Sequence, residues 1–216
     1  MSLEDILTKV AVAEKKYKRV QGSVKLIAVS KVQPIERIEQ VLEKGHRVFG
    51  ENRIQESINK WRPLIEKYGE VELHLVGSLQ TNKVKEAMQN FQVIHSVDRE
   101  KLVLKIESEA QRLGNCPELF IQVNTGNEIQ KAGVTVEKLE DLFKLAKDIY
   151  SLPVVGLMCL PPINESSLEH FLILSRLKAH LGLPRLSMGM SGDFEEAIRS
   201  GSTHVRIGSA LFGLRG

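Results

Sequence analysis

Short apolar runs rich in β-branched residues alternate with longer helical patterns along this chain, and this alternation constrains the fold most. The helical stretches separate eight such runs: VKLIAVS (24–30), HRVFGEN (46–52), LHLVGS (73–78), QVIHSVD (92–98), ELFIQVNT (118–125), PVVGLMCLP (153–161), PRLSMGM (184–190) and THVRIGS (203–209). Runs this apolar are typical of parallel strands that are covered on both faces. Eight strands alternating with helices predict an α/β fold, a single (β/α)₈ TIM barrel. An open doubly wound sheet is the alternative, but no GxGxxG follows the first run, so dinucleotide binding has no support.

The length of 216 residues fits one domain of this kind. We predict a single domain over residues 1–216, with an extra N-terminal helix over 1–20 and the barrel over 24–213. Pro34 and Gly45 bracket a helix after the first strand, in the usual order of proline at the start and glycine beyond the end. Apolar residues three and four apart fill that segment, as an amphipathic helix requires.

Composition excludes several classes of function. The net charge is only +3, and aromatic residues make up 5% of the chain, which is too few for a single-strand nucleic-acid surface. The basic cluster EKKYKR (14–19) is interpreted as the solvated C-terminus of the first helix. No apolar run approaches the length of a membrane span, and charge from residue 4 argues against a signal peptide. Cys116 and Cys159 show no metal spacing, which predicts a reducing, cytoplasmic location and no metal site.

Polar residues gather at the C-terminal ends of the predicted strands. They are Ser30, Lys31, Glu51, Asn52, Ser78, Asp98, Asn124, Ser191, Gly208 and Ser209. In a barrel these ends share one face, and that face carries the active sites of such folds. The opposite ends of the strands show no comparable set. We therefore expect the functional site at the C-terminal face.

Lys31 follows the first strand and is expected to share an inward face with Val29 and Ile27, since side chains alternate along a strand. An amine above a dry apolar layer has a lowered pKa and becomes a nucleophile for carbonyl compounds. Taken alone, a solvated strand end is the more common interpretation of such a lysine.

Glycine- and serine-rich turns follow the last two strands. Ser191 and Gly192 precede one helix, and Gly208 and Ser209 precede another, so their backbone N–H groups suit a phosphate. Asp193 with Glu196 has the spacing of a capping box. Two ordinary turns are the alternative.

Arg206 shares a strand face with Gly208 and therefore points into the barrel. An inward arginine needs a ring nitrogen, a carboxylate or a phosphate as its partner, and a structural ion pair is the alternative. A reactive lysine, a phosphate cradle and an inward cation together fit a phosphorylated aldehyde. Pyridoxal 5′-phosphate (PLP) meets all three requirements, and so does the substrate of an aldolase.

The motifs IAVSKVQP, VFGENRIQE, HLVGSLQTNK, IHSVDR, IQVNTGNEIQKAGV, GLMCLPP, LSMGMSGDFEEAI and GSTHVRIGSALFG resemble the YggS/PROSC family of PLP homeostasis proteins. The similarity runs in order from about Leu26 to Gly213. It implies a barrel similar to the N-terminal domain of alanine racemase, with PLP bound to a lysine and no firmly established catalysis. One departure is Leu73 before His74, where the family often has an aromatic residue.

The resemblance also implies roles for individual residues. Lys31, in AVSK, corresponds to the lysine that forms the aldimine with PLP, and Asn52, in GEN, lies near the cofactor. Ser191, Gly208 and Ser209 resemble phosphate ligands, and Arg206 resembles the partner of the pyridine nitrogen. Ser78 and Lys83 are expected at the mouth of the barrel without an assigned role.

Binding without turnover is the first functional hypothesis. An arginine at the pyridine nitrogen keeps that nitrogen unprotonated, which makes the ring a weak electron sink. Racemases of similar fold add a tyrosine from a second domain, whereas Tyr17, Tyr68 and Tyr150 lie at no strand's C-terminal end and no second domain is expected here. We predict a monomeric, non-catalytic PLP-binding protein that holds the cofactor or delivers it to PLP-requiring apo-enzymes. The alternatives are a PLP-dependent racemase or transaminase and a metal-free aldolase.

Overall fold

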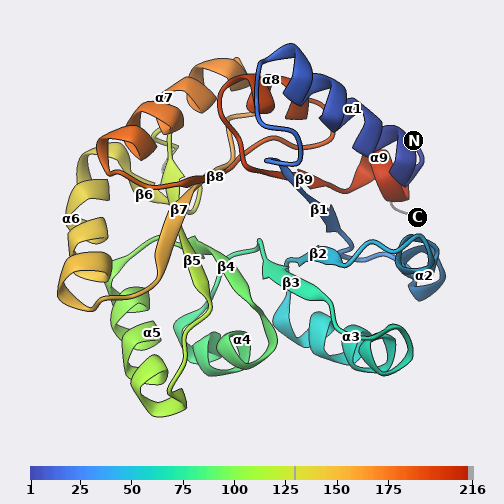
Figure 1. The fold of residues 1–216 in the computed structure, drawn as a ribbon. Helices are drawn as coiled ribbons and strands as arrows, with labels where there is room; N and C mark the ends of the chain where they lie inside the picture. The colour runs from blue at the N-terminus through green and yellow to red at the C-terminus, as the bar shows by residue number, and fades with distance from the viewer. Residues whose placement is uncertain (129, 214–216) are drawn as a thin grey trace.

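The computed structural model describes residues 1–128 and 130–213. Its strands are β1 (Lys25–Val29), β2 (Val48–Glu51), β3 (Glu72–Leu75), β4 (Val93–Val97), β5 (Glu118–Asn124), β6 (Val134–Thr135), β7 (Val154–Cys159), β8 (Arg185–Ser187) and β9 (His204–Ile207). They pair in parallel in the order β4-β3-β2-β1-β9-β8-β7-β5, and pairing of β4 with β5 closes the ring (Figure 1). The two-residue strand β6 pairs with the end of β5. The predicted eight-stranded barrel is therefore confirmed.

Helices surround the barrel on its outside (Figure 1). They are α1 (Leu3–Lys16), α2 (Ile35–Glu43), α3 (Ile54–Tyr68), α4 (Val84–Asn90), α5 (Glu100–Leu113), α6 (Leu139–Lys144), α7 (Ser167–His180), α8 (Phe194–Arg199) and α9 (Ser209–Phe212). The short 3₁₀ turns η1 (Thr81–Lys83) and η2 (Val136–Lys138) precede α4 and α6, and the π-helical turn η3 (Leu145–Ile149) continues α6. In the described residues, no helix combines the length and apolarity needed to cross a membrane.

The interior of the barrel is filled by side chains that fit around two glycines. A Cβ atom on Gly50 would lie 2.8 Å from Ile27 Cγ2, and one on Gly156 would lie 2.6 Å from Phe120 Cε1. Both large side chains are fully buried. The missing side chains therefore make room for large ones from neighbouring strands, as small barrels require.

Helix α2 follows the predicted pattern. Pro34 is its N-cap, and Gly45 lies just beyond its end with a φ of +83°, a conformation that glycine adopts without strain. Ile38 and Val41 are buried, whereas Ile35, at the start of the same apolar stripe, is 42% exposed. The helix therefore packs through Ile38, Val41 and Leu42 rather than through its first residue.

The N-terminal helix is shorter than predicted, and its basic end is not simply solvated. α1 ends at Lys16, and Lys18 has a φ of +54°, which no helix can continue. The Glu14 carboxylate is buried and accepts hydrogen bonds from the backbone N–H groups of Gly22 and Val24. Arg19 donates to the carbonyl oxygens of Ile198 at 3.0 Å and Ser202 at 3.1 Å. The interpretation of residues 14–19 as a solvated helix end therefore holds for Lys15, Lys16 and Lys18, which are exposed. It was wrong for Glu14 and Arg19, because Glu14 binds the loop before β1 and Arg19 ties this segment to α8 and to the loop before β9.

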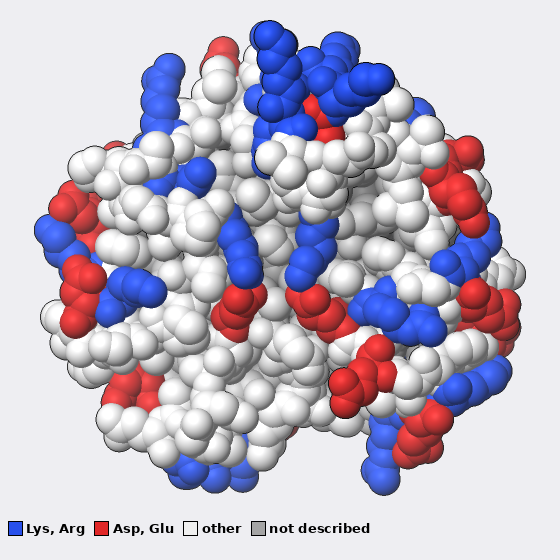
Figure 2. Space-filling view, in the orientation of Figure 1, with Lys and Arg blue, Asp and Glu red and all other residues white. Residues whose placement is uncertain are grey.

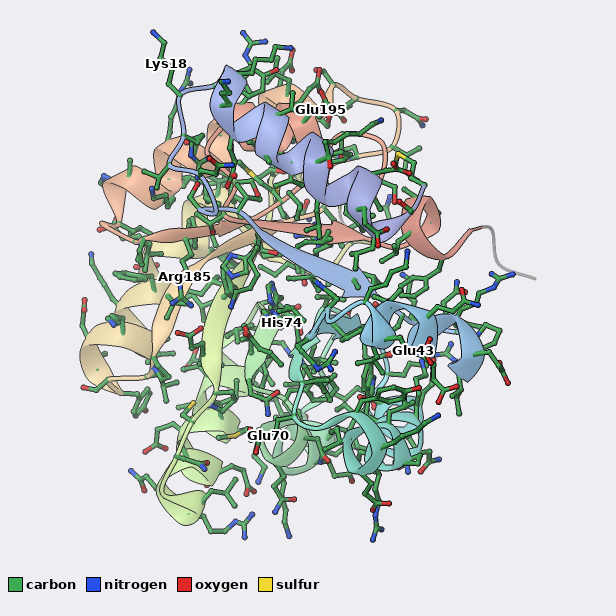
Figure 3. All side chains as sticks on the ribbon, turned by 45° about the vertical axis from the view of Figure 1, so that its right-hand side comes forward. Lys18, Glu43, Glu70, His74, Arg185 and Glu195 are labelled. Carbon is green, nitrogen blue, oxygen red and sulfur yellow. The ribbon has the colours of Figure 1, made fainter. Side chains whose placement is uncertain are left out.

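The expectation that the N-terminal strand ends lack a polar set was also wrong. The first residues of β1, β3, β5 and β8 form two ion pairs there, Lys25 with Glu72 and Arg185 with Glu118. Figure 2 shows basic and acidic side chains meeting at the centre of this face, and Figure 3 shows His74 inside the barrel. Each of these four strands contributes one charged residue. In the sequence, a single charged residue at the start of a strand is typical of a solvated strand end. Only closure of the barrel brings these residues together.

Candidate functional site

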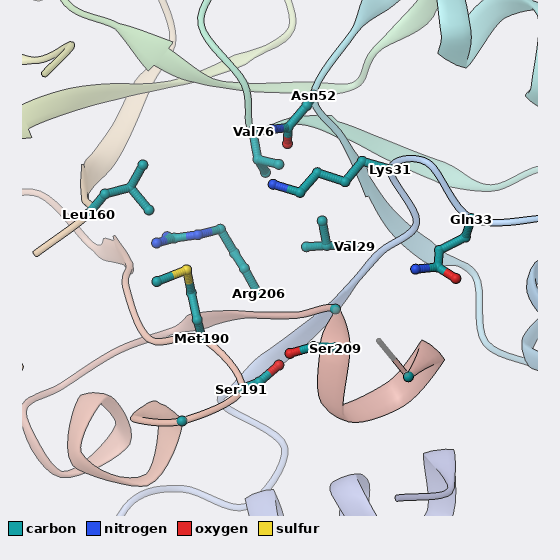
Figure 4. A pocket seen from close by; sticks show the side chains of 13 residues that line it. Val29, Lys31, Gln33, Asn52, Val76, Leu160, Met190, Ser191, Arg206 and Ser209 are labelled. Carbon is teal, nitrogen blue, oxygen red and sulfur yellow. The ribbon is translucent and has the colours of Figure 1, made fainter. Parts of the chain in front are cut away.

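A cavity of about 730 Å³ opens at the C-terminal ends of the barrel strands. Its wall contains all six residues singled out from the sequence: Lys31, Asn52, Ser191, Arg206, Gly208 and Ser209. Figure 4 shows the side chains of Lys31, Asn52 and Arg206 reaching toward the same space from three different strand ends. The barrel therefore assembles one site from motifs that are up to 178 residues apart in the chain, the separation of Lys31 from Ser209.

The backbone on both sides of Lys31 is held by polar groups, buried on the Ser30 side and partly exposed on the Val32 side. Ser30, which precedes it, donates from Oγ to Glu51 Oε1 at 2.6 Å, and its carbonyl oxygen accepts from Lys60 Nζ at 2.8 Å. Val32, which follows, donates its N–H to Glu56 Oε1 at 2.7 Å. Fixing both neighbours limits the directions in which the Lys31 side chain can leave the strand.

These partners form one largely buried ionic network next to Lys31, in which Glu51 and Lys60 are buried and Glu56 is partly exposed. Glu51 is fully buried, and its Oε1 also accepts from Lys60 Nζ and Trp61 Nε1, each at 3.0 Å. Lys60 donates to Glu56 Oε1 as well, at 2.9 Å. Such a network is strongly coupled, because losing one member leaves an uncompensated charge in a medium of low polarity.

The sequence interpretation missed this network. Lys60 lies on the buried stripe of α3, beside Ser57, Trp61 and Leu64. A lysine at a helical position that should be apolar was the available signal. Its partner Glu56 lies one turn earlier on α3, but its buried partners Ser30 and Glu51 lie on two other segments. The pairing becomes visible only when α3 packs against the ends of β1 and β2.

Val32 adds local strain next to Lys31. Its φ is +58°, in the left-handed region that β-branched residues avoid. Such a conformation costs about 1–2 kcal/mol. The hydrogen bond from its N–H to Glu56 offsets part of that cost and holds the turn closed.

The turns after β8 and β9 form a cradle of hydrogen-bond donors. Within residues 1–128 and 130–213, the backbone N–H groups of Ser191, Gly192 and Ser209 donate to no protein acceptor. Ser191 Oγ accepts from the Ala210 N–H at 3.2 Å and so links the two turns. A Cβ atom on Gly192 would meet nothing within 4 Å, so this edge of the cradle is open. Three N–H groups and two hydroxyls along one cavity wall suit the oxygens of a phosphate.

Asp193 does not form the predicted capping box with Glu196. It is the N-cap of α8, but its side chain makes no capping hydrogen bond. Its ψ of 9° departs from the extended conformation that aims an N-cap side chain at the helix. Instead, Asp193 Oδ1 accepts from the Met190 N–H at 2.6 Å and closes the turn that carries Ser191 and Gly192.

Arg206 is a buried cation beside the cavity. It is 4% exposed, and it donates from Nη1 to Ser187 Oγ at 2.7 Å and from Nη2 to the Cys159 carbonyl oxygen at 2.9 Å. No carboxylate of the described chain forms an ion pair with it, which removes the alternative of a structural ion pair. Burial lowers the pKa of its guanidinium. Its remaining N–H groups face a cavity in which a ring nitrogen or an anion would satisfy them.

Two of the expected mouth residues do not line the cavity, and several residues outside the six singled out do. Ser78 is exposed, and Lys83 forms an ion pair with Glu86 at 2.9 Å. The wall also contains Val29, Gln33, Val76, Leu160, Met190, Gly192 and Gly213. The apolar members carry no chemical signal in the sequence, so only the folded barrel identifies them.

The chain matches the family described as "Alanine racemase, N-terminal domain" over residues 5–216. It is 39% identical to the pyridoxal phosphate homeostasis protein of Vibrio cholerae, across 99% of this chain and 95% of that protein. This chain belongs to the family of pyridoxal phosphate homeostasis proteins. The resemblance predicted from the sequence motifs is therefore confirmed.

Solved structures agree with this assignment. PipY of Synechococcus elongatus, solved with PLP bound, is 32% identical, with a TM-score of 0.82 across 94% of this chain and 100% of that chain. Alanine racemase from Corynebacterium glutamicum has a TM-score of 0.66 across 99% of this chain and 61% of that chain. At 19% identity, the racemase is evidence for a shared barrel fold alone.

Proposed function

We propose that this chain binds PLP in the cavity at the C-terminal face and serves in PLP homeostasis, holding the cofactor or delivering it. One observation carries the proposal: Lys31, Arg206 and the donor cradle of Ser191, Gly192 and Ser209 line the same cavity. The homeostasis role of its relatives and the PLP bound to PipY support it.

The residues of the cavity fit the three polar parts of PLP. The cofactor supplies an aldehyde for covalent attachment to an amine, a phosphate, and a pyridine nitrogen. The Lys31 amine provides the nucleophile, the cradle provides N–H groups for the phosphate, and Arg206 provides donors for the nitrogen. Asn52 provides an amide on the wall between Lys31 and β3.

We also infer that the site holds PLP without turning over a substrate. The wall formed by the described residues contains no tyrosine, histidine, aspartate or glutamate that would move a proton opposite Lys31. Tyr68, for example, donates its hydroxyl to Glu39 at the end of α3. Arg206 is a donor to the ring nitrogen and supplies it with no proton, so the ring remains a weak electron sink.

Borohydride reduction of the PLP-loaded protein followed by peptide mapping tests the site. We expect the label on Lys31 in the parent protein and no label in Lys31→Ala. Lys83 lies at the same face but outside the cavity, so Lys83→Ala should be labelled as in the parent. Label on another lysine in the parent protein would overturn the assignment. Protein that stays colourless with added PLP would favour the aldolase alternative.

The enzyme alternative has its own test. A PLP-dependent racemase or transaminase removes the α-deuterium of an amino acid, which NMR detects directly. We expect no exchange across a panel of amino acids, and rapid exchange with one of them would show that the site is catalytic.

We further propose that the chain acts as a cytoplasmic monomer that supplies PLP-requiring apo-enzymes. Both cysteines, Cys116 and Cys159, are free thiols, as a reducing compartment favours. Transfer to an apo-enzyme in the presence of a PLP scavenger tests direct delivery. Reactivation that the scavenger abolishes would show release into solution instead.

A further inference from the structure

A line of hydrogen-bonded side chains crosses the barrel interior from the cavity to its opposite end. Arg206 Nη1 lies 2.7 Å from Ser187 Oγ, which lies 2.9 Å from His95 Nδ1. His95 Nε2 lies 2.8 Å from His74 Nδ1, and His74 Nε2 lies 2.8 Å from Glu72 Oε1. Ser187, His95 and His74 are fully buried, and Figure 3 shows His74 inside the barrel. Glu72 ends the line at the N-terminal face.

With both imidazole rings neutral, the chemistry of the two ends fixes the direction of every bond in this line. Arginine only donates hydrogen bonds, and an ionised carboxylate only accepts them. Ser187 therefore accepts from Arg206 and donates to His95 Nδ1, and His95 donates from Nε2 to His74 Nδ1. His74 then donates from Nε2 to Glu72. The opposite direction would place a lone pair of neutral His74 against the Glu72 carboxylate.

Both histidines are neutral in this arrangement. Burial lowers the pKa of His74, although the Glu72 carboxylate opposes that effect. Burial together with His74 and His204 holds the pKa of His95 well below its usual range. Neutral rings carry one N–H each, so the directional line requires the Nε2–H tautomer in both.

The groups around this line hold it in place. The Phe120 ring stacks on His95 with centroids 4.4 Å apart and an angle of 6° between planes. His204 lies against both histidines, with centroids 6.1 Å from His74 and 6.2 Å from His95. Lys25 binds Glu72 at 2.8 Å and keeps it ionised, while Glu118 pairs with Arg185 beside it.

We propose that Ser187, His95 and His74 are positioning residues for Arg206, and that this directional line couples the cavity to Glu72 across the barrel. The proposal rests on the proposed function, in which Arg206 faces the pyridine nitrogen of PLP. Arg206 is a buried cation without an ion-pair partner in the described chain, and the line of aligned dipoles leads from it to a carboxylate. Hydrogen bonds that polarise one another strengthen the whole line.

The direction of the line also agrees with the role of Arg206 as a pure donor. Each proton of the line already points toward Glu72, away from the cavity. Passing a proton to the cavity would require every bond in the line to reverse and arginine to give up its own proton, which it does not do in proteins. The line therefore aims the guanidinium at the ring nitrogen and supplies that nitrogen with no proton.

NMR of the ring nitrogens tests the direction in the protein without PLP. We expect Nε2–H tautomers for both His74 and His95 at pH 7. An Nδ1–H tautomer or a doubly protonated ring at either position would overturn the proposal. This measurement does not depend on PLP, so it separates a failure of the line from a failure of the proposed function, which the Lys31 labelling reports.

Ser187→Ala tests the positioning role, with Ser96→Ala as the matched control. Ser96 is buried in β4 like Ser187 in β8, but its hydroxyl has no hydrogen-bond partner in the described chain. We expect Ser187→Ala to weaken PLP binding about tenfold, to change the absorbance of bound PLP and to shift the His95 Nδ1 resonance. Ser96→Ala should change none of these, and equal PLP binding by the two variants would overturn the positioning role.

Glu72→Gln tests the coupling at the far end and covers the case in which Ser187→Ala does not fold. The amide keeps an acceptor oxygen for His74 but removes the charge. We expect PLP binding to weaken by about threefold and its absorbance to change, because the line loses its negative end. Glu118→Gln is the control at the same face but outside the line, and an equal effect of both variants would contradict the coupling.

Discussion

Replacing Lys60 by methionine tests whether the buried network under the site holds Lys31 in place. Methionine keeps much of the length of the side chain and removes its charge and its three N–H donors. The ammonium group binds the Ser30 carbonyl oxygen at 2.8 Å, Glu56 Oε1 at 2.9 Å and Glu51 Oε1 at 3.0 Å. All three interactions are lost together.

The expected cost follows from the burial of Glu51. That residue is fully buried, and Lys60 forms an ion pair with its Oε1. Its Oε2 has no hydrogen-bond partner in the described chain, so little else compensates its charge. Removing one member of a buried pair costs about 3–5 kcal/mol. For a chain of this size, that lowers the melting temperature by on the order of 10 °C. The double variant Lys60→Met/Glu51→Gln removes both charges and should recover all but about 1–2 kcal/mol.

Urea unfolding at pH 7 measures the free energy, and borohydride labelling measures whether Lys31 still reaches PLP. Arg62→Met is the control on the same helix: its side chain is 84% exposed, and its contact with Glu66 is long, at 3.7 Å. The control should change stability by less than about 0.5 kcal/mol. A cost below about 1 kcal/mol for Lys60→Met would refute the network argument. If Lys60→Met loses about 3–5 kcal/mol as expected but Lys31 is still labelled as in the parent, the positioning argument is refuted.

Three further perturbations follow from the structure. Gly77→Ala places a Cβ atom 2.3 Å from the Asn52 carbonyl oxygen. We expect urea unfolding to show a loss of about 2 kcal/mol in stability and a PLP titration to show weaker binding. Values like those of the parent protein would contradict the close approach. Burial lowers the pKa of His204 to about 3, whereas this histidine has a pKa near 6.5 in the unfolded chain. Above about pH 6.5 the residue is neutral in both states and does not affect stability. As the pH falls from about 6.5 toward 3, the unfolded chain binds the proton and the folded chain does not, so stability decreases. At pH 5 this residue alone costs about 2 kcal/mol, and His95 acts in the same direction, so equal unfolding midpoints at pH 7 and pH 5 would contradict the burial argument. Val32→Asn suits the left-handed backbone and should stabilise the fold by about 1 kcal/mol in urea unfolding, whereas a loss would mean that the valine side chain contributes more than its strain costs.

The parts of the fold and site that the sequence predicted share a local signal. Each barrel strand is a short apolar run, and Lys31 or Ser191 stands directly at the end of such a run. Because parallel strands point the same way, knowing where each strand ends is enough to place these residues on one face. The helix boundaries were less predictable. At the end of α1, Lys18 has a positive φ, Glu14 binds the following loop, and Arg19 contacts a distant segment.

The parts that the sequence did not predict depend on pairings between distant segments. Lys60 lies 30 residues from Ser30, and His95 lies 92 residues from Ser187. Nothing at either position in the sequence specifies the partner, because a buried lysine or histidine fits many environments. Their roles follow from register and packing, which fix which side chains face one another once the barrel has closed.

The two buried networks have a common physical logic. One leads from the turn around Lys31 to Glu51 and Glu56. The other leads from Arg206 to Glu72. Lys31 and Arg206 are therefore both held by polar groups that lie outside the cavity. Among the described residues, the carboxylates that anchor these two groups lie outside the cavity wall. A site built this way gains firm positions for a covalent and a hydrogen-bonding contact while its anchoring charges stay at a distance. For the proposed function, this arrangement favours holding a reactive aldehyde in one position.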